Sequence, residues 1–371
     1  MPIFMDRHDV PGVTARDVAE AHQEDLKIQS NYDCRALTYW FDEERGMAFC
    51  LIEAPGEASV QKLHDHAHGL IPNQIIEVEP KVVEAFLGRI EDPEEQNATN
   101  LIINDPAFRS IMVIGLDEVI QIQKKTGNQE AVGALNTIKE TLESELSKHN
   151  GLKVEHNENC FIASFASVTQ SVLCALAIQQ CFKEHNATNT KHKIYTRIGL
   201  SAGVPVSTSG SDGFFGDTVK LAKRLCFTLH TGQVAVASLV SELYNAQKLN
   251  IQTEEKTLSP LSPSDENFLN QTMDLMESSA CTADFDVEAF SKHMGISKPQ
   301  LYRKTTAISG YSPNDLIKEY RLKRALQLIE QQSGNISEIA YDTGFNSLSY
   351  FSKCFQKRFD ILPSDYAHAI A

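Results

Sequence analysis

The sequence predicts a multidomain fold in which two α+β domains are followed by an all-α domain. Its 371 residues, 42% of them hydrophobic, are more than one ordinary core holds. Two stretches without hydrophobic periodicity, residues 90–100 and 253–267, are acidic or rich in Ser and Pro, as is typical of linkers. Beyond the second stretch strand patterns stop and short amphipathic helices follow. We therefore expect domains at residues 1–88, 107–248 and 266–371.

The distribution of charge restricts which part of the chain can meet nucleic acid. The formal net charge is -15, which argues against a protein that coats nucleic acid along its whole length. Residues 284–371 contain 11 Lys and Arg residues and 10 Asp and Glu residues. Residues 1–283 contain 23 Lys and Arg residues and 39 Asp and Glu residues. Only the C-terminal part suits a phosphate backbone.

Cysteine usage and hydropathy point to a cytoplasmic location. The eight cysteines form no CxxC pair, so we expect reduced and mostly buried thiols. No stretch approaches the roughly 18 apolar residues of a membrane span, and the first residues lack the pattern of a signal peptide.

In the N-terminal block the periodicity predicts strands at residues 3–8, 35–41, 47–53 and 74–79 and helices at residues 15–30 and 57–69. This βαββαβ order is that of the ferredoxin-like unit. Thr14 and Asp17 form a capping pair for the first helix.

Histidines are concentrated in this block, which holds five of the chain's 12. His64 and His68 are four residues apart on one helix, a spacing that lets two imidazoles reach one metal. Imidazole and thiolate ligands suit Ni, Zn or Cu better than Mg or Ca. The candidate ligands are His8, His22, Cys50, His64 and His68. The alternative is that His22 is a packed core histidine and that HDHAHG (64–69) is a solvated helix end.

The segments MPIFMDRHDVPG, AHQEDL, YW, FCLIEAP and HDHAHG resemble a small ferredoxin-like family with nickel-binding, nickel-responsive members. The resemblance covers the whole block. It implies a metal-binding sensor domain.

The middle block alternates strands and helices in an order that predicts one α+β sheet domain. Its segments RIGLSAGVPV (197–206) and FFGDTVKLAKRL (214–225) resemble the class III nucleotidyl cyclase catalytic domain. Two Asp residues bind a metal pair in that family. The resemblance puts the first at Asp117 and the second at Asn159, whose neutral amide is a poor ligand for a hard cation.

Further positions of the cyclase pattern are also altered. Arg224 keeps the place of the arginine that stabilises the developing phosphate charge, but Lys220 stands where the family has Asn. Glu155 resembles the guanine-selecting Glu, whereas Gly213 occupies the second base-selecting place. We therefore expect a catalytically inactive domain that forms a head-to-tail homodimer. It either binds a nucleotide through Glu155, Lys220 and Arg224 or is purely structural.

The C-terminal block contains two helix-turn-helix outlines joined by a long helix. In the first, Gly295 ends a helix and Ser297 caps the next. In the second, Gly344 makes the turn. The segments GYSPNDLIKEYRLKRALQLI and ISEIAYDTGFNSLSYFSKCFQKRFDILPSDY resemble the DNA-binding domain of AraC-family transcription regulators. The resemblance implies two recognition helices in successive segments of the major groove.

The predicted DNA-facing side chains lie on these two helices, where Arg and Gln suit base edges and Lys suits phosphates. They are Ser297, Lys298, Gln300, Arg303 and Lys304 on the first and Asn346, Ser347, Ser349, Tyr350, Lys353, Gln356 and Lys357 on the second. The alternative is a solvated basic face on a helical bundle.

Together the three blocks predict a one-component transcription regulator that binds a double-stranded DNA operator as a homodimer. Its effector is either Ni²⁺ or another divalent metal at the N-terminal block or a nucleotide in the middle block. Two alternatives remain: an active cyclase coupled to a DNA-binding domain, and a metal store with a DNA-binding tail.

Overall fold

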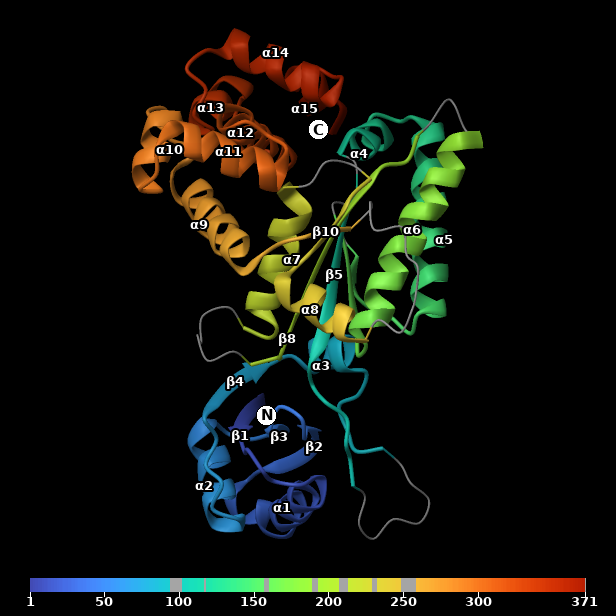
Figure 1. The fold of residues 1–371 in the computed structure, drawn as a ribbon, viewed down its shortest axis with the longest axis vertical. Coiled ribbons are helices and arrows are strands. Elements are labelled where there is room, and N and C mark those ends of the chain that lie inside the picture. The colour runs from blue at the N-terminus through green and yellow to red at the C-terminus, as the bar shows by residue number, and fades with distance from the viewer. Residues whose placement is uncertain are drawn as a thin grey trace.

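The computed structural model describes residues 1–93, 102–116, 118–156, 160–188, 193–206, 213–228, 232–247 and 258–370. Three folded units follow one another along the long axis of the molecule (Figure 1). The N-terminal unit lies at one end, the sheet of the middle unit lies in the centre, and the C-terminal helices lie at the other end beside that sheet. The mixed α+β and all-α fold class is confirmed.

The N-terminal unit has the predicted ferredoxin-like order. Its elements are β1 (Ile3–Asp9), α1 (Ala15–Ile28), the 3-10 helix η1 (Gln29–Tyr32), β2 (Arg35–Asp42), β3 (Met47–Glu53), α2 (Glu57–Ala67) and β4 (Gln74–Val78). The strands pair antiparallel in the order β2-β3-β1-β4. Helix α1 begins with the predicted capping box between Thr14 and Asp17. Both α1 and α2 lie on the side of the sheet that faces away from the middle unit (Figure 1).

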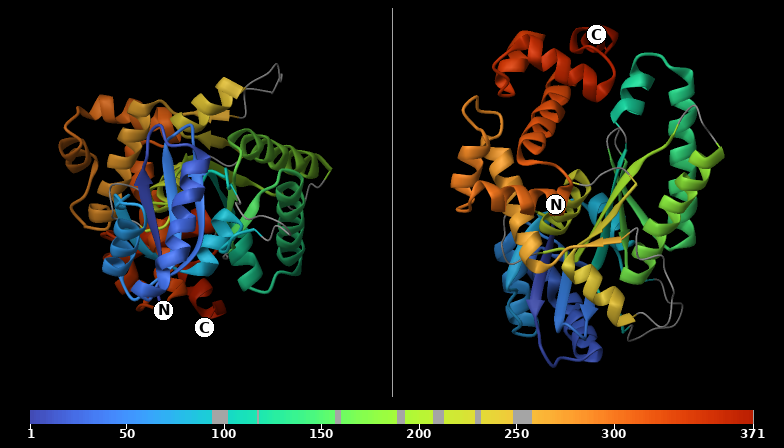
Figure 2. Two further views of the ribbon diagram at one scale, coloured as in Figure 1. Left: turned by 90° about the horizontal axis from the view of Figure 1, so that it is seen from below. Right: turned by 45° about the horizontal axis from the view of Figure 1, so that its top comes forward.

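Helix α3 (Pro80–Leu87), an element not predicted from the sequence, joins the first two units. A single buried cluster runs from Trp40 and Phe49 of the N-terminal sheet, through Phe86 of α3, to Ile111 and Phe215 of the middle unit. In the left view of Figure 2, seen from below, the N-terminal unit lies in front of the other two units. The face of the N-terminal sheet opposite α1 and α2 is therefore an interdomain contact.

The middle unit is built on one six-stranded sheet. Its elements are β5 (Arg109–Leu116), α4 (Glu118–Lys125), α5 (Gln129–Lys148), β6 (Leu152–His156), β7 (Cys160–Phe165), α6 (Val168–Thr188), β8 (Thr196–Gly203), α7 (Gly216–Thr228), β9 (Val234–Val236), α8 (Ser238–Gln247) and β10 (Leu258–Pro260). The strand order is β10-β9-β8-β5-β7-β6. Helices α5 and α6 cover one face, and α7 packs on β8 and β5 from the other.

Strand β10 departs from the linker prediction for residues 253–267. It pairs parallel with β9, so residues 258–260 extend the middle sheet. The Ser- and Pro-rich composition concealed a three-residue edge strand, where Pro is tolerated because one side of the strand needs no ladder bond. The domain bounds 1–88, 107–248 and 266–371 stay a prediction.

The C-terminal unit confirms the double helix-turn-helix. Its helices are α9 (Pro263–Ser279), α10 (Val287–His293), α11 (Lys298–Ser309), α12 (Pro313–Glu330), α13 (Ile336–Asp342), α14 (Leu348–Phe359) and α15 (Pro363–Ile370). The turns contain Gly295 with a φ of 64° and Gly344 with a φ of 83°, a region that favours glycine. Helix α12 contributes to both hydrophobic cores and so fixes one helix-turn-helix relative to the other.

Candidate metal centre, cyclase-like cavity and DNA interface

A cluster of metal-ligating side chains lies between the N-terminal sheet and its two helices. Strands β1 and β3 are the central strands, and their register sets Asp6 opposite Cys50. Because side chains alternate along a strand, Asp6, His8 and Cys50 share the face that α1 and α2 cover. Helix α2 places His64 over this face, and His68 caps the C-terminus of the same helix.

Short distances connect these side chains. His64 Nε2 lies 2.8 Å from Asp6 Oδ2, and His64 Nδ1 lies 3.0 Å from His68 Nε2 and 3.2 Å from Asp25 Oδ1. His8 Nε2 lies 3.1 Å from Asp6 Oδ1. Asp6 and His64 are fully buried, and Asp25 is 1% exposed. Charged groups so deeply buried need counter-charges or a metal ion.

Several donor atoms in the cluster lack a hydrogen bond. Both ring nitrogens of His8 and Oδ1 of Asp25 are buried and make no hydrogen bond, although His8 Nε2 lies 3.1 Å from Asp6 Oδ1 and Asp25 Oδ1 lies 3.2 Å from His64 Nδ1. A buried polar atom without a partner typically costs about 1–3 kcal/mol. Beside them is a cavity of about 20 Å³, lined by His8, Asp25, Cys50 and His68 among others, which is large enough for one water molecule or ion. The arrangement therefore fits metal coordination.

The electrostatics of the cluster follow from burial and close pairing. Burial alone would lower the pKa of His64, but Asp6 and Asp25 outweigh it and raise that pKa to about 10. Burial would likewise raise the pKa of Asp6, but His64 and His8 lower it below its usual range. Burial, followed by the negative charges of Asp6 and Asp25, raises the pKa of the Cys50 thiol well above its ordinary value. A bound cation would replace the proton of His64 and stabilise a Cys50 thiolate.

The cluster gathers four of the five predicted ligands, His8, Cys50, His64 and His68, and adds Asp6 and Asp25. The fifth, His22, is 4% exposed and lines the small cavity. Its Nε2 lies 3.1 Å from Asp92 Oδ2, and its ring centroid lies 5.0 Å from that of Tyr39. Asp25 is not among the ligands that the sequence predicts. Its signal was an acidic residue on the buried stripe of α1 that also holds Val18 and His22.

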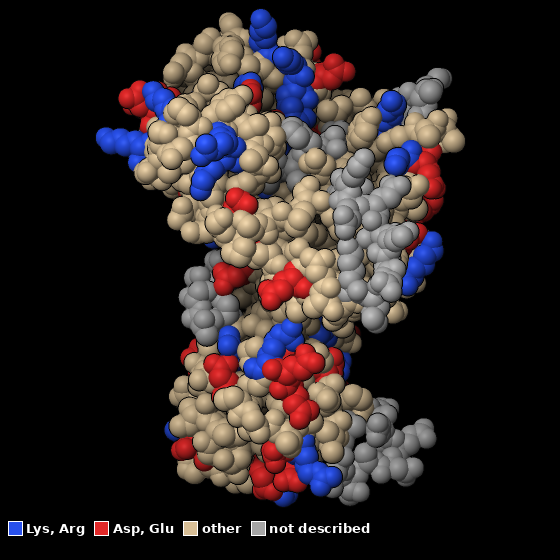
Figure 3. Space-filling view, in the orientation of Figure 1, with Lys and Arg blue, Asp and Glu red and all other residues tan. Residues whose placement is uncertain are grey.

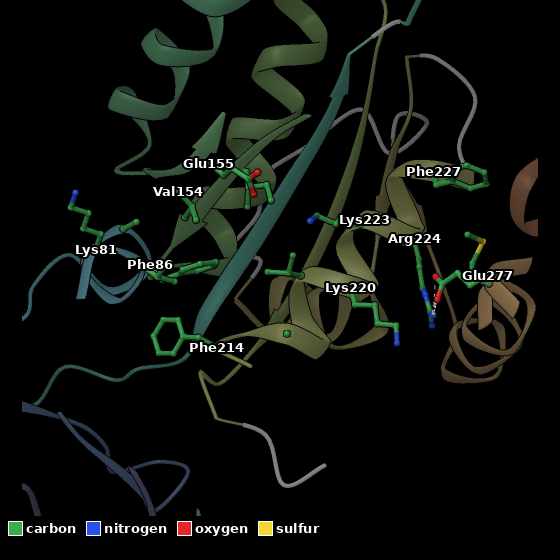
Figure 4. Close-up of a pocket in the computed structure, with 16 residues that line it drawn as sticks. Lys81, Phe86, Val154, Glu155, Phe214, Lys220, Lys223, Arg224, Phe227 and Glu277 are labelled. Atoms are coloured by element: carbon green, nitrogen blue, oxygen red, sulfur yellow. Dashed lines mark hydrogen bonds and ion pairs between the residues drawn. The ribbon is translucent and has the colours of Figure 1, made fainter. Parts of the chain in front are cut away.

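The cyclase-like unit contains a cavity of about 800 Å³ between α3, β6, α7 and α9 (Figure 4). Glu155 of β6 and Lys220, Lys223 and Arg224 of α7 line it. The sheet therefore brings three predicted nucleotide-binding residues, Glu155, Lys220 and Arg224, to one cavity. Asp117 and Asn159, the positions of the cyclase metal pair, lie outside the described residues.

Within this cavity, Arg224 is held by the helix that begins the C-terminal unit. Its guanidinium donates to Asp274 and to Asn270 Oδ1 at 2.9 Å and lies 3.3 Å from Glu277 Oε1 (Figure 4). The Arg224 side chain is only 5% exposed. Lys220 is more open, and its Nζ lies 3.8 Å from Asp274. Carboxylates of α9 therefore face Arg224, the residue that the sequence predicts to meet phosphate charge.

A second ion-pair network ties the middle unit to the second helix-turn-helix. Glu118, the first residue of α4, lies 2.7 Å from Arg197 of β8, 2.8 Å from Arg358 of α14 and 3.3 Å from Lys323 of α12. Arg358 also pairs with Glu319 at 3.0 Å. Ile122 of α4 is buried within the core of the second helix-turn-helix. The C-terminal unit is thus docked on the middle unit through both α9 and α4.

The predicted DNA-facing side chains form an open surface. All twelve on α11, α14 and their N-caps are exposed, from Ser297 to Lys304 and from Asn346 to Lys357. Figure 3 shows Lys and Arg side chains over the visible face of the C-terminal unit with some Asp and Glu among them, and Asp and Glu beside Lys and Arg on the N-terminal unit. Ser297 and Ser347 accept hydrogen bonds as N-caps, and Gln300 completes a capping box, so these three side chains also serve helix structure. Tyr302 and Tyr350 add exposed aromatic surface beside the polar groups.

Family models match this architecture in three separate stretches. They are "Nickel responsive protein SCO4226-like" over residues 4–78, "Adenylate and Guanylate cyclase catalytic domain" over residues 109–261 and "Helix-turn-helix domain" over residues 290–369. The chain thus combines an SCO4226-like domain, a cyclase-like domain and an AraC-type helix-turn-helix domain. The three resemblances predicted from the sequence are confirmed.

Curated relatives match parts of the chain. "Histidine kinase P4" of Formosa agariphila is 44% identical over 117 residues, which are 32% of this chain and 8% of that protein. The "HTH-type transcriptional activator RhaS" of Mannheimia succiniciproducens is 32% identical over 82 residues, 22% of this chain and 31% of its own length. The regulator GbdR of Pseudomonas aeruginosa is 29% identical over 132 residues, 35% and 36% of the two chains. This chain therefore spans well under half the length of each.

Solved structures resemble the separate domains. SCO4226 from Streptomyces coelicolor is 34% identical, with 20% of this chain and 94% of that chain covered and a TM-score of 0.20. An AraC-type regulator from Chromobacterium violaceum is 29% identical, with coverages of 30% and 97% and a TM-score of 0.27. A cyclase/hydrolase from Silicibacter pomeroyi is 22% identical, with coverages of 38% and 82% and a TM-score of 0.33. In the described part of the chain, no helix has the length and apolarity needed to cross a membrane.

Proposed function

We propose that this protein is a sequence-specific DNA-binding transcription regulator whose DNA affinity responds to a divalent transition metal in the N-terminal domain. The observation that carries the proposal is the pair of exposed recognition helices, α11 and α14, held in one rigid unit by α12. The names of the curated relatives RhaS and GbdR support the same output.

The metal centre supplies the effector site. Asp6, His8, Cys50 and His64 would hold the ion, with Asp25 and His68 beside them. Sulfur and imidazole donors favour Ni²⁺, Zn²⁺ or Cu over Mg²⁺ and Ca²⁺. The matching family is described as nickel-responsive, which supports the same choice. A bound ion would supply charge that fixes β1, β3 and α2 relative to one another.

The same strands provide a physical connection to the rest of the protein. On β3, Cys50 faces the metal cluster while its neighbours Phe49 and Leu51 face the interdomain cluster. That cluster reaches Phe215, directly before α7, and α7 contacts α9 of the DNA-binding unit. A shift of β3 on metal binding therefore acts on a continuous packed path toward the DNA-binding domain.

In this proposal the cyclase-like domain is a noncatalytic core that forms the homodimer and can hold a nucleotide near Glu155 and Lys220. The ion pairs of Arg224 with α9 support the absence of catalysis, because its guanidinium charge is already compensated. The substitution of Lys220 for the family's Asn supports it as well.

The DNA-binding proposal is tested by selecting random-sequence duplexes with the full chain and measuring the affinity of the enriched duplex. If Arg303 and Lys353 contact bases, replacing either with Ala should weaken binding by about 1–3 kcal/mol. If they contact phosphate, each substitution should reduce the slope of the logarithm of the binding constant against the logarithm of salt concentration by about one. Lys139→Ala, an exposed lysine on α5, is the matched control. Failure to enrich any duplex would overturn the proposal.

Metal control is tested on the same duplex. Ni²⁺ should change the affinity of the wild-type protein and leave that of the His64→Ala/His68→Ala variant unchanged. Equal affinity with and without Ni²⁺, Zn²⁺ or Co²⁺ in a protein that binds these ions would instead favour the metal store.

A further inference from the structure

We propose that the N-terminal cluster holds two metal ions bridged by the imidazole ring of His64. The first ion would bind His64 Nε2 together with Asp6, His8 and Cys50, and the second would bind His64 Nδ1 together with Asp25 and His68. This inference rests on the proposed metal centre and specifies its stoichiometry and ligands.

The cluster divides into two donor groups that share only one residue. Asp6, His8, Cys50 and His64 form one group, and Asp25, His64 and His68 form the other, with the donor atoms of each within 4.8 Å of one another. The two ring nitrogens of His64 face different groups, since Nε2 lies 2.8 Å from Asp6 and Nδ1 lies 3.2 Å from Asp25. The ring is fully buried between them.

Donor spacings in both groups match those of metal coordination. Bonds of about 2.1 Å set neighbouring donors roughly 3.0 Å apart in an octahedron and roughly 3.4 Å apart in a tetrahedron. In the first group His64 Nε2 lies 2.8 Å from Asp6 Oδ2 and His8 Nε2 lies 3.1 Å from Asp6 Oδ1, so each ring faces a different carboxylate oxygen. In the second group the spacings are 3.0 Å from His64 to His68 and 3.4 Å from His68 to Asp25.

Unsatisfied buried atoms occur in both groups. Both nitrogens of His8, which is 4% exposed, make no hydrogen bond in the first group, and Oδ1 of Asp25 makes none in the second. A single ion in the first group would use His8 and leave Asp25 Oδ1 unsatisfied. Two ions would give a partner to Asp25 Oδ1 and to one ring nitrogen of His8.

Charge balance also favours two ions. Two divalent cations bring four positive charges, and the carboxylates of Asp6 and Asp25, a Cys50 thiolate and a bridging His64 imidazolate bring four negative ones. The thiol and the imidazole ring release their protons to water on binding. His68, whose side chain is 11% exposed, and Leu70, which is 39% exposed, line the adjoining cavity and give the second ion a route from solvent.

The test is a Co²⁺ titration of the metal-free full chain, with the bound metal measured after equilibrium dialysis and followed by absorption and EPR spectroscopy. Wild type should bind two ions more than His64→Ala, which gives the baseline for binding elsewhere on the chain. The first ion should produce a thiolate-to-cobalt charge-transfer band. The second should weaken the Co²⁺ EPR signal by magnetic coupling across a ring that holds the ions about 6 Å apart.

Variants distinguish the two positions. Asp25→Asn and His68→Gln should each bind one ion, keep the thiolate band and show an uncoupled EPR signal, whereas Cys50→Ser should lose the band. His66→Ala, an exposed histidine of the same helix outside both donor groups, is the control and should still bind two ions.

The number of ions that wild type binds above the baseline distinguishes failure of the two-ion bridge from failure of the metal centre itself. One ion above the baseline in wild type, with a thiolate band and an uncoupled signal, would overturn the bridge and leave the metal centre. No ion above the baseline would overturn both. Two ions without magnetic coupling would overturn the bridging role of His64.

Discussion

Replacing Glu118 with Gln should loosen the contact between the cyclase-like domain and the second helix-turn-helix. The substitution keeps the size of the side chain and removes a carboxylate that faces Arg197, Lys323 and Arg358. Among the described residues, Glu118 is the acidic partner within ion-pair distance of Arg197, whose side chain is 7% exposed. The variant therefore leaves a nearly buried cation without a counter-charge.

The size of the effect follows from these partners. Removing one member of a fully buried ion pair costs about 3–5 kcal/mol. The Glu118 side chain is 14% exposed, and Glu319 still compensates Arg358 and Lys323, so we expect about 2–3 kcal/mol. Since about 1.4 kcal/mol corresponds to a factor of ten, the interface should open roughly 30 to 150 times more often.

Native-state hydrogen exchange measures this opening in separate segments. In Glu118→Gln, exchange should accelerate in α4, α12 and α14 and stay unchanged in the N-terminal domain. The matched control is Glu288→Gln, which removes the same charge from an exposed pair with Lys298 and should change stability by less than about 1 kcal/mol. The reasoning is refuted if Glu118→Gln exchanges at the wild-type rate in α4 and α14.

The difference between wild type and Glu118→Gln should also depend on pH. Burial alone would raise the pKa of Glu118, but Lys323, Arg197 and Arg358 outweigh it and lower the pKa well below the ordinary 4.5. A carboxylate with a lowered folded-state pKa stabilises the contact at neutral pH, and this contribution declines as the pH falls below about 4.5. The two proteins should therefore converge in acid, and a difference that grows below pH 4 would contradict the assignment.

Three further predictions concern catalysis, domain coupling and metal. Incubation with ATP or GTP and Mn²⁺ should give no sustained cyclic nucleotide formation, and a product that Asp117→Ala abolishes would show an active cyclase. In thermal unfolding, Phe86→Ala should destabilise the junction of the first two domains by about 3–5 kcal/mol, because the ring lies 5.0 Å from the ring of Phe215 in a buried stack. Leu239→Ala, on the exposed surface, is the control and should have little effect. Saturating Ni²⁺ at 100 times its dissociation constant should stabilise the N-terminal domain by about 2.7 kcal/mol for each ion bound. Chelation should reverse this, and His64→Ala should show neither change.

Local sequence patterns determined the order and type of most elements. Hydrophobic periodicity defined the strands and helices of the N-terminal unit, and Thr14, Ser297 and the turn glycines marked helix ends, because each of these signals acts over a few residues. The same patterns placed His64 and His68 on one helix and His8 and Cys50 on paired strands. Helix α3 and strand β10 were missed because short elements carry too little periodicity to be distinguished from loops.

Only the tertiary structure decided which distant side chains meet. Asp25 joins His64 because α1 and α2 pack side by side, although 39 positions separate them in the sequence. Arg224 meets Asp274 because α9 lies against α7, and Glu118 meets Arg358 because α4 lies in the core of the second helix-turn-helix. The sequence by itself therefore determined the three domains and their candidate ligands and DNA-facing residues. The pairing of charges between domains required the tertiary structure, because electrostatic contacts depend on distance in space and carry no fixed spacing along the chain.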